Sequence, residues 1–167
     1  MDALKWMKTD EALNAHLGRM IRQAATLELY LEQTVKVLCG GPYGALLISG
    51  ESTSRVIDAC RALVKVHHAL TDEWREEFNT VLSDAKQAFE RRNRYVHGAI
   101  SWQGEVAVPG NSRSRRLKLE AEFVPLDLDD LVDLTSELNR LTLATGSCLR
   151  AALDGFPDHL AEDYSDD

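Results

Sequence analysis

Apolar residues recur at every third or fourth position through most of the chain, which is the spacing of one face of an α-helix. This pattern predicts four helices, at residues 9–38, 52–67, 71–98 and 131–152. Thr9 and Thr71 each precede two acids that favour a helix start, and the run Gly40-Gly41-Pro42 ends the first helix. Residues 43–49 form a short apolar segment whose structure the pattern does not specify.

After Gly98 the apolar period changes from a helical one to two, which indicates β-strands. Two alternating runs cover residues 100–108 and 117–123, and Pro109-Gly110-Asn111-Ser112 lies between them. We therefore expect a β-hairpin with a long, basic tip. The predicted fold class is all-α, a single up-and-down helical bundle with this β-hairpin inserted before the last helix.

The chain has 167 residues, of which 44% are hydrophobic and 28% charged, as is usual for one soluble globular domain. We expect this domain to cover residues 1–157, because no linker divides the chain. The formal net charge is -8, which argues against nucleic-acid binding through bulk charge alone. Residues 158–167 contain no Lys or Arg, and we expect this acidic tail to be disordered. Its acids are Asp158, Glu162, Asp163, Asp166 and Asp167.

Cysteine usage and hydropathy predict a cytoplasmic protein that does not enter a membrane. No apolar run approaches the length needed to cross a bilayer, and the N-terminus lacks the basic and apolar regions of a signal peptide. Cys39, Cys60 and Cys148 are far apart, odd in number and each beside apolar residues. We expect them to be buried, reduced thiols.

The predicted helix over residues 71–98 carries an arginine on its apolar face. The stripe on that face passes through Trp74, Phe78, Val81, Leu82, Ala85, Phe89, Arg92 and Val96. An inward-facing arginine is costly unless it is paired or faces a cleft or a partner chain. His97 follows five residues later, and Gly98 stops the helix. We interpret Arg92 and His97 as parts of one site.

The run Arg92-Asn93-Arg94-Tyr95-Val96-His97 resembles the Arg-X4-His signature of the HEPN superfamily, in which a polar residue, here Asn93, follows the arginine. The overall plan is also similar, because that family is a small helical bundle with the motif at the end of its third long helix. The resemblance implies an endoribonuclease that uses neither metal nor cofactor and works as a homodimer, with the two motifs meeting across the interface. It further implies a toxin or defence component with a cognate antitoxin or a nucleotidyltransferase-type partner.

The residue-level match is confined to Arg92, Asn93 and His97, and their chemistry suits RNA cleavage without a metal. The 2′-hydroxyl must attack the adjacent phosphorus, which requires a base, an acid and stabilisation of the extra phosphoryl charge. His97 is the candidate base or acid because histidine titrates near neutral pH. Arg92 is the candidate for charge stabilisation because its planar cation matches phosphate oxygens. Asn93 shares a helix face with His97 and is placed to orient the imidazole.

Helix geometry gives a separate reason to expect a dimer. Arg92 and His97 are five residues apart, or about 140° around a regular helix, so one straight helix does not bring both onto one phosphate. Either the helix loosens at residues 96–98, or a second copy supplies the complement. Further substrate contacts are expected from neighbouring side chains and from the hairpin tip, namely Arg91, Arg94, Tyr95, Arg113, Arg115 and Arg116. For the tip, an ordinary solvated loop is an equally good interpretation.

Plainer interpretations of the same residues are available. Arg92 is structural if it pairs with a carboxylate of the first helix such as Glu28 or Glu32, and His97 taken alone is typical of a helix C-terminal cap. The chain would then be a non-catalytic binding module of the same fold. The pair His67-His68 is not expected to hold a metal ion, because adjacent helix residues point about 100° apart and no third ligand has suitable spacing.

Overall fold

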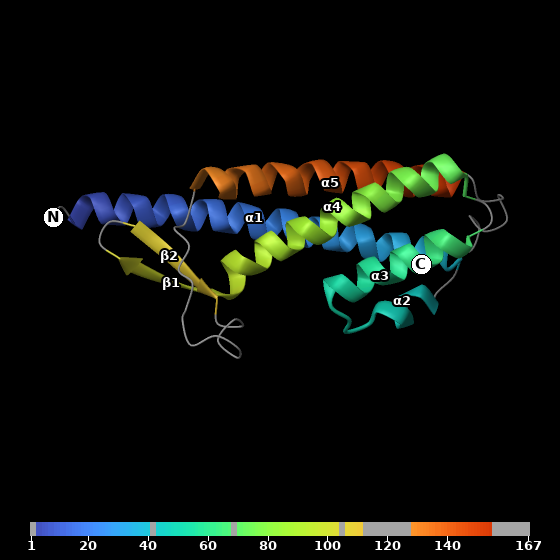
Figure 1. The fold of residues 1–167 in the computed structure, drawn as a ribbon, viewed down its shortest axis with the longest axis horizontal. Helices are drawn as coiled ribbons and strands as arrows, with labels where there is room; N and C mark the ends of the chain where they lie inside the picture. The colour runs from blue at the N-terminus through green and yellow to red at the C-terminus, as the bar shows by residue number, and fades with distance from the viewer. Residues whose placement is uncertain (1–2, 41–42, 68–69, 104–105, 112–127, 155–167) are drawn as a thin grey trace, which may run out of the picture. The chain divides into compact units, whose positions relative to one another are not determined.

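The computed structural model describes residues 3–40, 43–67, 70–103, 106–111 and 128–154 (Figure 1). Its elements follow the order α1, α2, α3, α4, β1, β2, α5. Contacts divide the chain into two compact units, the first comprising Met1–Ala24 and Gln87–Leu138, and the second Ala25–Lys86 and Asn139–Asp167. The predicted acidic tail, residues 158–167, lies outside the described residues. None of the described helices is both long and apolar enough to cross a membrane.

Three helices lie close to their predicted positions. α3 spans Thr53–Val66, α4 spans Asp72–His97 and α5 spans Leu128–Asp154. The side-chain oxygen of Thr71 accepts a hydrogen bond of 3.2 Å from the backbone N–H of Trp74, which satisfies one free donor in the first turn of α4. The capping role assigned to Thr71 is therefore confirmed.

The first two helices differ from expectation. α1 spans Ala3–Leu38 and begins before Thr9, because no Gly or Pro interrupts the residues ahead of that threonine. Its end agrees with the prediction, and Gly40 adopts a φ of 63°, a conformation that favours glycine. α2 spans Tyr43–Ile48, so the apolar segment without an assigned structure is a short helix.

The second unit has a core drawn from four helices. Its buried side chains include Leu31 of α1, Ile57 of α3, Phe78 of α4 and Leu141 of α5. The thiol of Cys60 donates a hydrogen bond of 3.5 Å to the backbone carbonyl of Leu31, which links α3 to α1. α2 lies very close to α1, since a Cβ added at Gly44 would stand 2.7 Å from the Cα of Lys36. Burial of these apolar faces supplies the main driving force for this unit.

The first unit combines the start of α1, the end of α4, the two strands and the start of α5. Its buried side chains include Leu13 and Met20 of α1, Phe89 of α4, and Leu131 and Leu134 of α5. Phe89 continues the buried stripe that Phe78, Leu82 and Ala85 begin on the same helix. The inward face predicted for α4 is therefore confirmed as far as Phe89.

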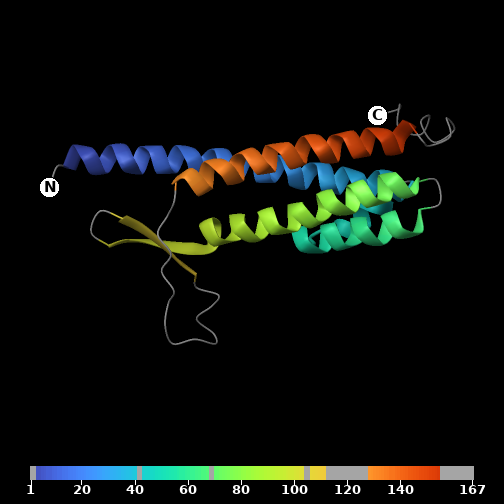
Figure 2. The same ribbon diagram turned by 45° about the horizontal axis from the view of Figure 1, so that its top comes forward.

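The strands correct the predicted hairpin. β1 (Gly98–Gln103) and β2 (Val106–Asn111) pair antiparallel beyond the end of α4, with Gly98 opposite Asn111 and Gln103 opposite Val106 (Figure 2). The single strand predicted over residues 100–108 is wrong, because those residues belong to two strands that pair with each other. Residues 109–111 were predicted as the turn but lie in β2, and the second predicted strand, residues 117–123, lies outside the described residues.

The period of two misled the prediction for a simple reason. Only residues 104 and 105 separate the strands, so the apolar residues stay at even-numbered positions on both sides of the connection: Ile100, Trp102, Val106 and Val108. Gly104 was the local sign of a break inside the run. The all-α bundle with a hairpin across residues 100–123 is thus corrected to five described helices and a hairpin that ends at Asn111.

Candidate functional site

The candidate site lies on the last turns of α4, in the first unit. Arg92 comes three residues after the buried Phe89 and takes the next position of the same helix face. The side chain of Arg92 is half-buried, and its Nε is buried with no hydrogen-bond partner among the described residues. The inward position predicted for Arg92 therefore agrees with the structure.

Asn93 holds the guanidinium of Arg92. The Nη1 atom of Arg92 donates a hydrogen bond of 3.0 Å to Oδ1 of Asn93. Among the described side chains, no carboxylate forms an ion pair with Arg92, and Glu28, its partner in the structural interpretation, accepts a hydrogen bond from Thr53. A buried donor without a partner costs about 1–3 kcal/mol. An anionic ligand at Arg92 would recover part of that free energy.

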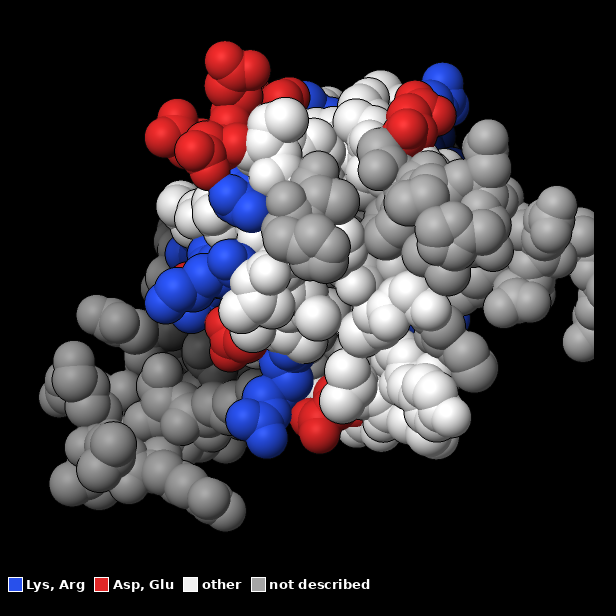
Figure 3. Space-filling model, turned by 90° about the vertical axis from the view of Figure 1, so that its right-hand side faces the viewer, with Lys and Arg blue, Asp and Glu red and all other residues white. Residues whose placement is uncertain are grey.

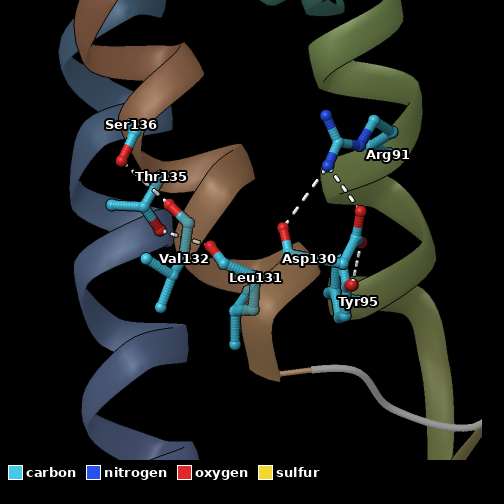
Figure 4. A network of polar contacts seen from close by, with 7 residues as sticks. All are labelled: Arg91, Tyr95, Asp130, Leu131, Val132, Thr135 and Ser136. Atoms are coloured by element: carbon cyan, nitrogen blue, oxygen red, sulfur yellow. Dashed lines mark hydrogen bonds and ion pairs between the residues drawn. The ribbon is translucent and has the colours of Figure 1, made fainter.

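Two other residues of this helix end, Arg91 and Tyr95, both bind the carboxylate of Asp130 (Figure 4). Nη2 of Arg91 lies 2.5 Å from Oδ1 of Asp130 and 3.3 Å from the Asp130 backbone carbonyl. The phenol of Tyr95 donates a hydrogen bond to Oδ2 of the same carboxylate. Asp130 stands in the first turn of α5, where an acid is also favoured by the helix dipole. The end of α4 and the start of α5 are thereby joined through one side chain.

The pKa values of Asp130 and Tyr95 shift in opposite directions. Burial alone would raise the pKa of Asp130, but the hydrogen bonds from Tyr95 and Arg91, with the charges of Arg91 and Arg94, hold that pKa below its ordinary value. Burial raises the pKa of Tyr95, and its hydrogen bond to the Asp130 carboxylate raises it further. The network is therefore a charged aspartate with a neutral tyrosine across the whole neutral pH range.

The other predicted site residues divide into three groups. Arg94 is exposed on α4, while Arg91 and the buried Tyr95 are bound to Asp130. His97 is the last residue of α4, but its side chain lies outside the described residues. Arg113, Arg115 and Arg116, the predicted basic tip, also lie outside them. The structure thus brings Arg92 and Asn93 together, and it places Arg91 and Tyr95 in a different set of contacts.

Asp130 is the residue that sequence reasoning missed. The predicted last helix began at residue 131, directly after Asp130, whereas the structure places Asp130 in the first turn of α5. Arg91 and Tyr95 are four residues apart, so they share a face of α4, and that spacing was the available sign of a common partner. The identity of the partner depends on how α4 and α5 pack and is not encoded locally.

The described residues contain no group of three or more His, Cys, Asp or Glu side chains that would hold a metal ion. The last turns of α4 offer a guanidinium and its amide neighbour, and the helix ends at a histidine. The HEPN resemblance rests on this motif and on the helical plan. Comparisons of the chain with protein families, with curated proteins and with solved structures find no match.

Proposed function

We propose that this chain is a metal-independent endoribonuclease of the HEPN type that acts as a homodimer in a toxin or defence system. The observation that carries the proposal is the half-buried guanidinium of Arg92, which has an unpaired Nε and a hydrogen bond to Asn93 but no carboxylate partner among the described residues. An arginine kept apart from carboxylates suits an anionic ligand such as phosphate better than it suits a structural role.

In the proposed reaction, the 2′-oxygen of RNA attacks the neighbouring phosphorus, and the bond from phosphorus to the next 5′-oxygen breaks. His97 accepts the proton of the 2′-hydroxyl, and a protonated His97 from the second copy gives a proton to the leaving oxygen. Arg92 stabilises the additional charge on the phosphoryl oxygens. The products carry a 2′,3′-cyclic phosphate and a 5′-hydroxyl, and DNA is inert because it lacks the attacking group.

The helical geometry of α4 supports the dimer in this proposal. α4 stays helical through His97, and β1 begins at Gly98. Arg92 and His97 of one copy are then about 140° apart around the axis. A second copy would bring the two groups together at one phosphate.

Among the predicted substrate contacts, Arg94 is best supported. Arg94 is exposed, and it lies on the same stretch of α4 as Arg92. Arg91 is committed through its Nη2 to Asp130, so a phosphate would have to compete with that carboxylate for it. The contributions proposed for Tyr95, Arg113, Arg115 and Arg116 stay predictions.

The decisive experiment is cleavage of single-stranded RNA in the presence of a chelator. We expect Arg92→Ala and His97→Ala each to lower the rate by about a hundredfold or more. Arg140→Ala is the matched control, because Arg140 is a partly exposed arginine that pairs with Asp84 at 2.9 Å in the second unit. It should leave the rate unchanged. Equal rates in the parent, Arg92→Ala and His97→Ala would overturn the assignment.

A non-catalytic binding module of the same fold is the second candidate. It is favoured by the charge distribution, since the chain carries a net charge of -8. On the face shown in Figure 3, acidic and basic side chains of the described residues form separate small groups. Induced expression separates the candidates: toxicity abolished by His97→Ala favours the nuclease, and harmless expression of the parent favours the binding module.

A further inference from the structure

We infer that Asp130 is a positioning residue for the site, because its carboxylate fixes the two turns of α4 that carry Arg92, Asn93 and His97. This inference rests on the nuclease proposed above as far as the reaction is concerned. Its structural part concerns the first unit alone and can be tested without any activity. Asp130 itself is not placed to touch substrate, since both of its carboxylate oxygens are already bound to protein donors.

The contacts of Asp130 span one full turn of α4. Oδ1 receives Nη2 of Arg91 at 2.5 Å, and Oδ2 receives the phenol of Tyr95 (Figure 4). Arg91 and Tyr95 are four residues apart and therefore stand above one another on the helix. A helix end held at two points one turn apart cannot rotate about its axis or unwind without breaking a charge-assisted hydrogen bond.

The two anchored residues lie on a different face from the motif. With about 100° per residue, Asn93 and His97 fall on the side of α4 opposite to Arg91 and Tyr95, and Arg92 falls between the two sides. The anchor therefore leaves the motif positions clear of Asp130 while it holds the backbone that carries them. The Tyr95 end of the anchor is buried, with 9% of the residue exposed, which protects its hydrogen bond from competition by water.

Asp130 also decides which arginine is neutralised. Arg91, Arg92 and Arg94 are close in sequence, yet the described structure pairs Asp130 with Arg91. Each oxygen of that carboxylate has a donor, Arg91 or Tyr95, and among the described residues no ion pair joins Asp130 to Arg92. The aspartate therefore holds the helix end and leaves the Arg92 cation available for a phosphate.

The test compares substitutions that remove parts of this anchor. Asp130→Asn keeps the shape of the side chain but removes its charge and one acceptor, Tyr95→Phe removes one donor, and Asp130→Glu restores the charge on a longer stem. The matched control is Asp84→Asn, because the Asp84–Arg140 ion pair also joins α4 to α5, in the second unit. Two measurements are made: hydrogen–deuterium exchange of peptides covering residues 90–97, and the steady-state kinetics of RNA cleavage.

We expect amide exchange at residues 90–97 to become about tenfold faster or more in Asp130→Asn and Tyr95→Phe, with no change in Asp84→Asn. We expect kcat to fall by about ten- to a hundredfold with little change in KM, and Asp130→Glu to recover part of it. Unchanged exchange in Asp130→Asn overturns the inference. Faster exchange with an unchanged kcat also overturns it, because the anchor would then be structural only.

The outcomes keep this inference separate from the proposed function. If the parent cleaves no RNA under conditions in which it is folded and dimeric, the nuclease proposal fails, and exchange at residues 90–97 still decides whether Asp130 fixes the end of α4. If the parent and the Asp130 variants cleave RNA equally well while Arg92→Ala is inactive, the nuclease proposal stands and the positioning role is rejected.

Discussion

The indole Nε1 of Trp74 donates a hydrogen bond of 3.0 Å to the backbone carbonyl of Cys148. This bond is buried and connects the first turn of α4 to the last part of α5 within the second unit. The ring of Trp74 also lies against Phe78, with 5.0 Å between ring centroids and a tilted arrangement. One side chain therefore supplies apolar packing, and its buried N–H finds an acceptor in the neighbouring helix.

Replacing Trp74 by Phe should lower the free energy of unfolding by about 1–3 kcal/mol, because it removes a buried hydrogen bond and part of the buried ring. Urea denaturation followed by circular dichroism measures the change. Ser83→Ala is the control, since this exposed serine should contribute less than about 0.5 kcal/mol. A Trp74→Phe protein as stable as the parent would show that the bond is unimportant.

Alanine substitutions at Gly44 and Gly18 should change the stability of the protein in opposite directions. A Cβ at Gly44 would stand 2.7 Å from the backbone Cα of Lys36, so Gly44→Ala must push α2 away from α1 and should cost about 1–3 kcal/mol. A Cβ at Gly18 meets no atom within 4 Å inside the regular helix α1, so Gly18→Ala should stabilise the protein by about 0.5–1 kcal/mol. Thermal unfolding of both variants checks the pair, and two shifts of the same sign would contradict it.

The pKa of Asp130 predicts how stability depends on pH. Its folded-state pKa lies below the unfolded value of about 3.9, so its stabilising contribution is complete above that value and is lost as the pH falls through the folded-state pKa. The difference in unfolding free energy between the parent and Asp130→Asn should be level between about pH 6 and pH 8, and should shrink below about pH 4. Because 38% of the Asp130 side chain is exposed, the full difference should be no more than about 1–2 kcal/mol.

Denaturant titrations at several pH values measure this difference. Asp84→Asn again serves as the comparison, since its ion pair with Arg140 is partly exposed and its effect should be small throughout. A difference between the parent and Asp130→Asn that stays constant from neutral pH to about pH 3 would contradict the assignment.

The three cysteines should react at very different rates. Burial, with a smaller contribution from Cys39, raises the pKa of Cys60 to about 12, and burial followed by the charge of Glu77 raises that of Cys148 to about 11. Burial also raises the pKa of Cys39, but this residue is only half-buried. At pH 8 only about one Cys60 thiol in ten thousand is then ionised.

A colorimetric thiol reagent at pH 8 should therefore label Cys39 first in the native protein and all three thiols after denaturation. Cys39→Ser supplies the control, because it should abolish the fast phase and leave the slow one. Rapid native labelling in Cys39→Ser would show that Cys60 or Cys148 is accessible, contrary to the structure.

Local patterns predicted the helices well, because each helix has to bury one face. Phe78, Leu82 and Phe89 are buried at the positions that the period of α4 assigns to them, and Thr71 caps that helix as expected. The start of α1 was missed because capping residues such as Thr9 favour a helix start without requiring one. The half-buried Arg92 also followed from the period alone.

Two features were missed. One is a turn that does not interrupt the apolar period of two, and the other is a contact that depends on tertiary structure. The turn between β1 and β2 was hidden because Trp102 and Val106 are an even number of residues apart, so the period of two in the sequence continues across it. The role of Asp130 was hidden because Arg91, Arg92 and Arg94 are chemically alike, and only the packing of α4 against α5 selects Arg91. A sequence pattern shows that a carboxylate is present, but it does not show which cation that carboxylate meets.

The contact between Asp130 and Arg91 has a consequence for binding thermodynamics. Asp130 acts as a tethered counter-ion, so Arg91 has no mobile anion to release when a polynucleotide arrives, and Arg92 and Arg94 are the two cations of this cluster left to do so. For single-stranded RNA, the logarithm of the affinity due to this cluster should then fall with the logarithm of salt concentration with a slope of about 1.4. In Asp130→Asn the slope should steepen to about 2.1, because a third cation joins the exchange.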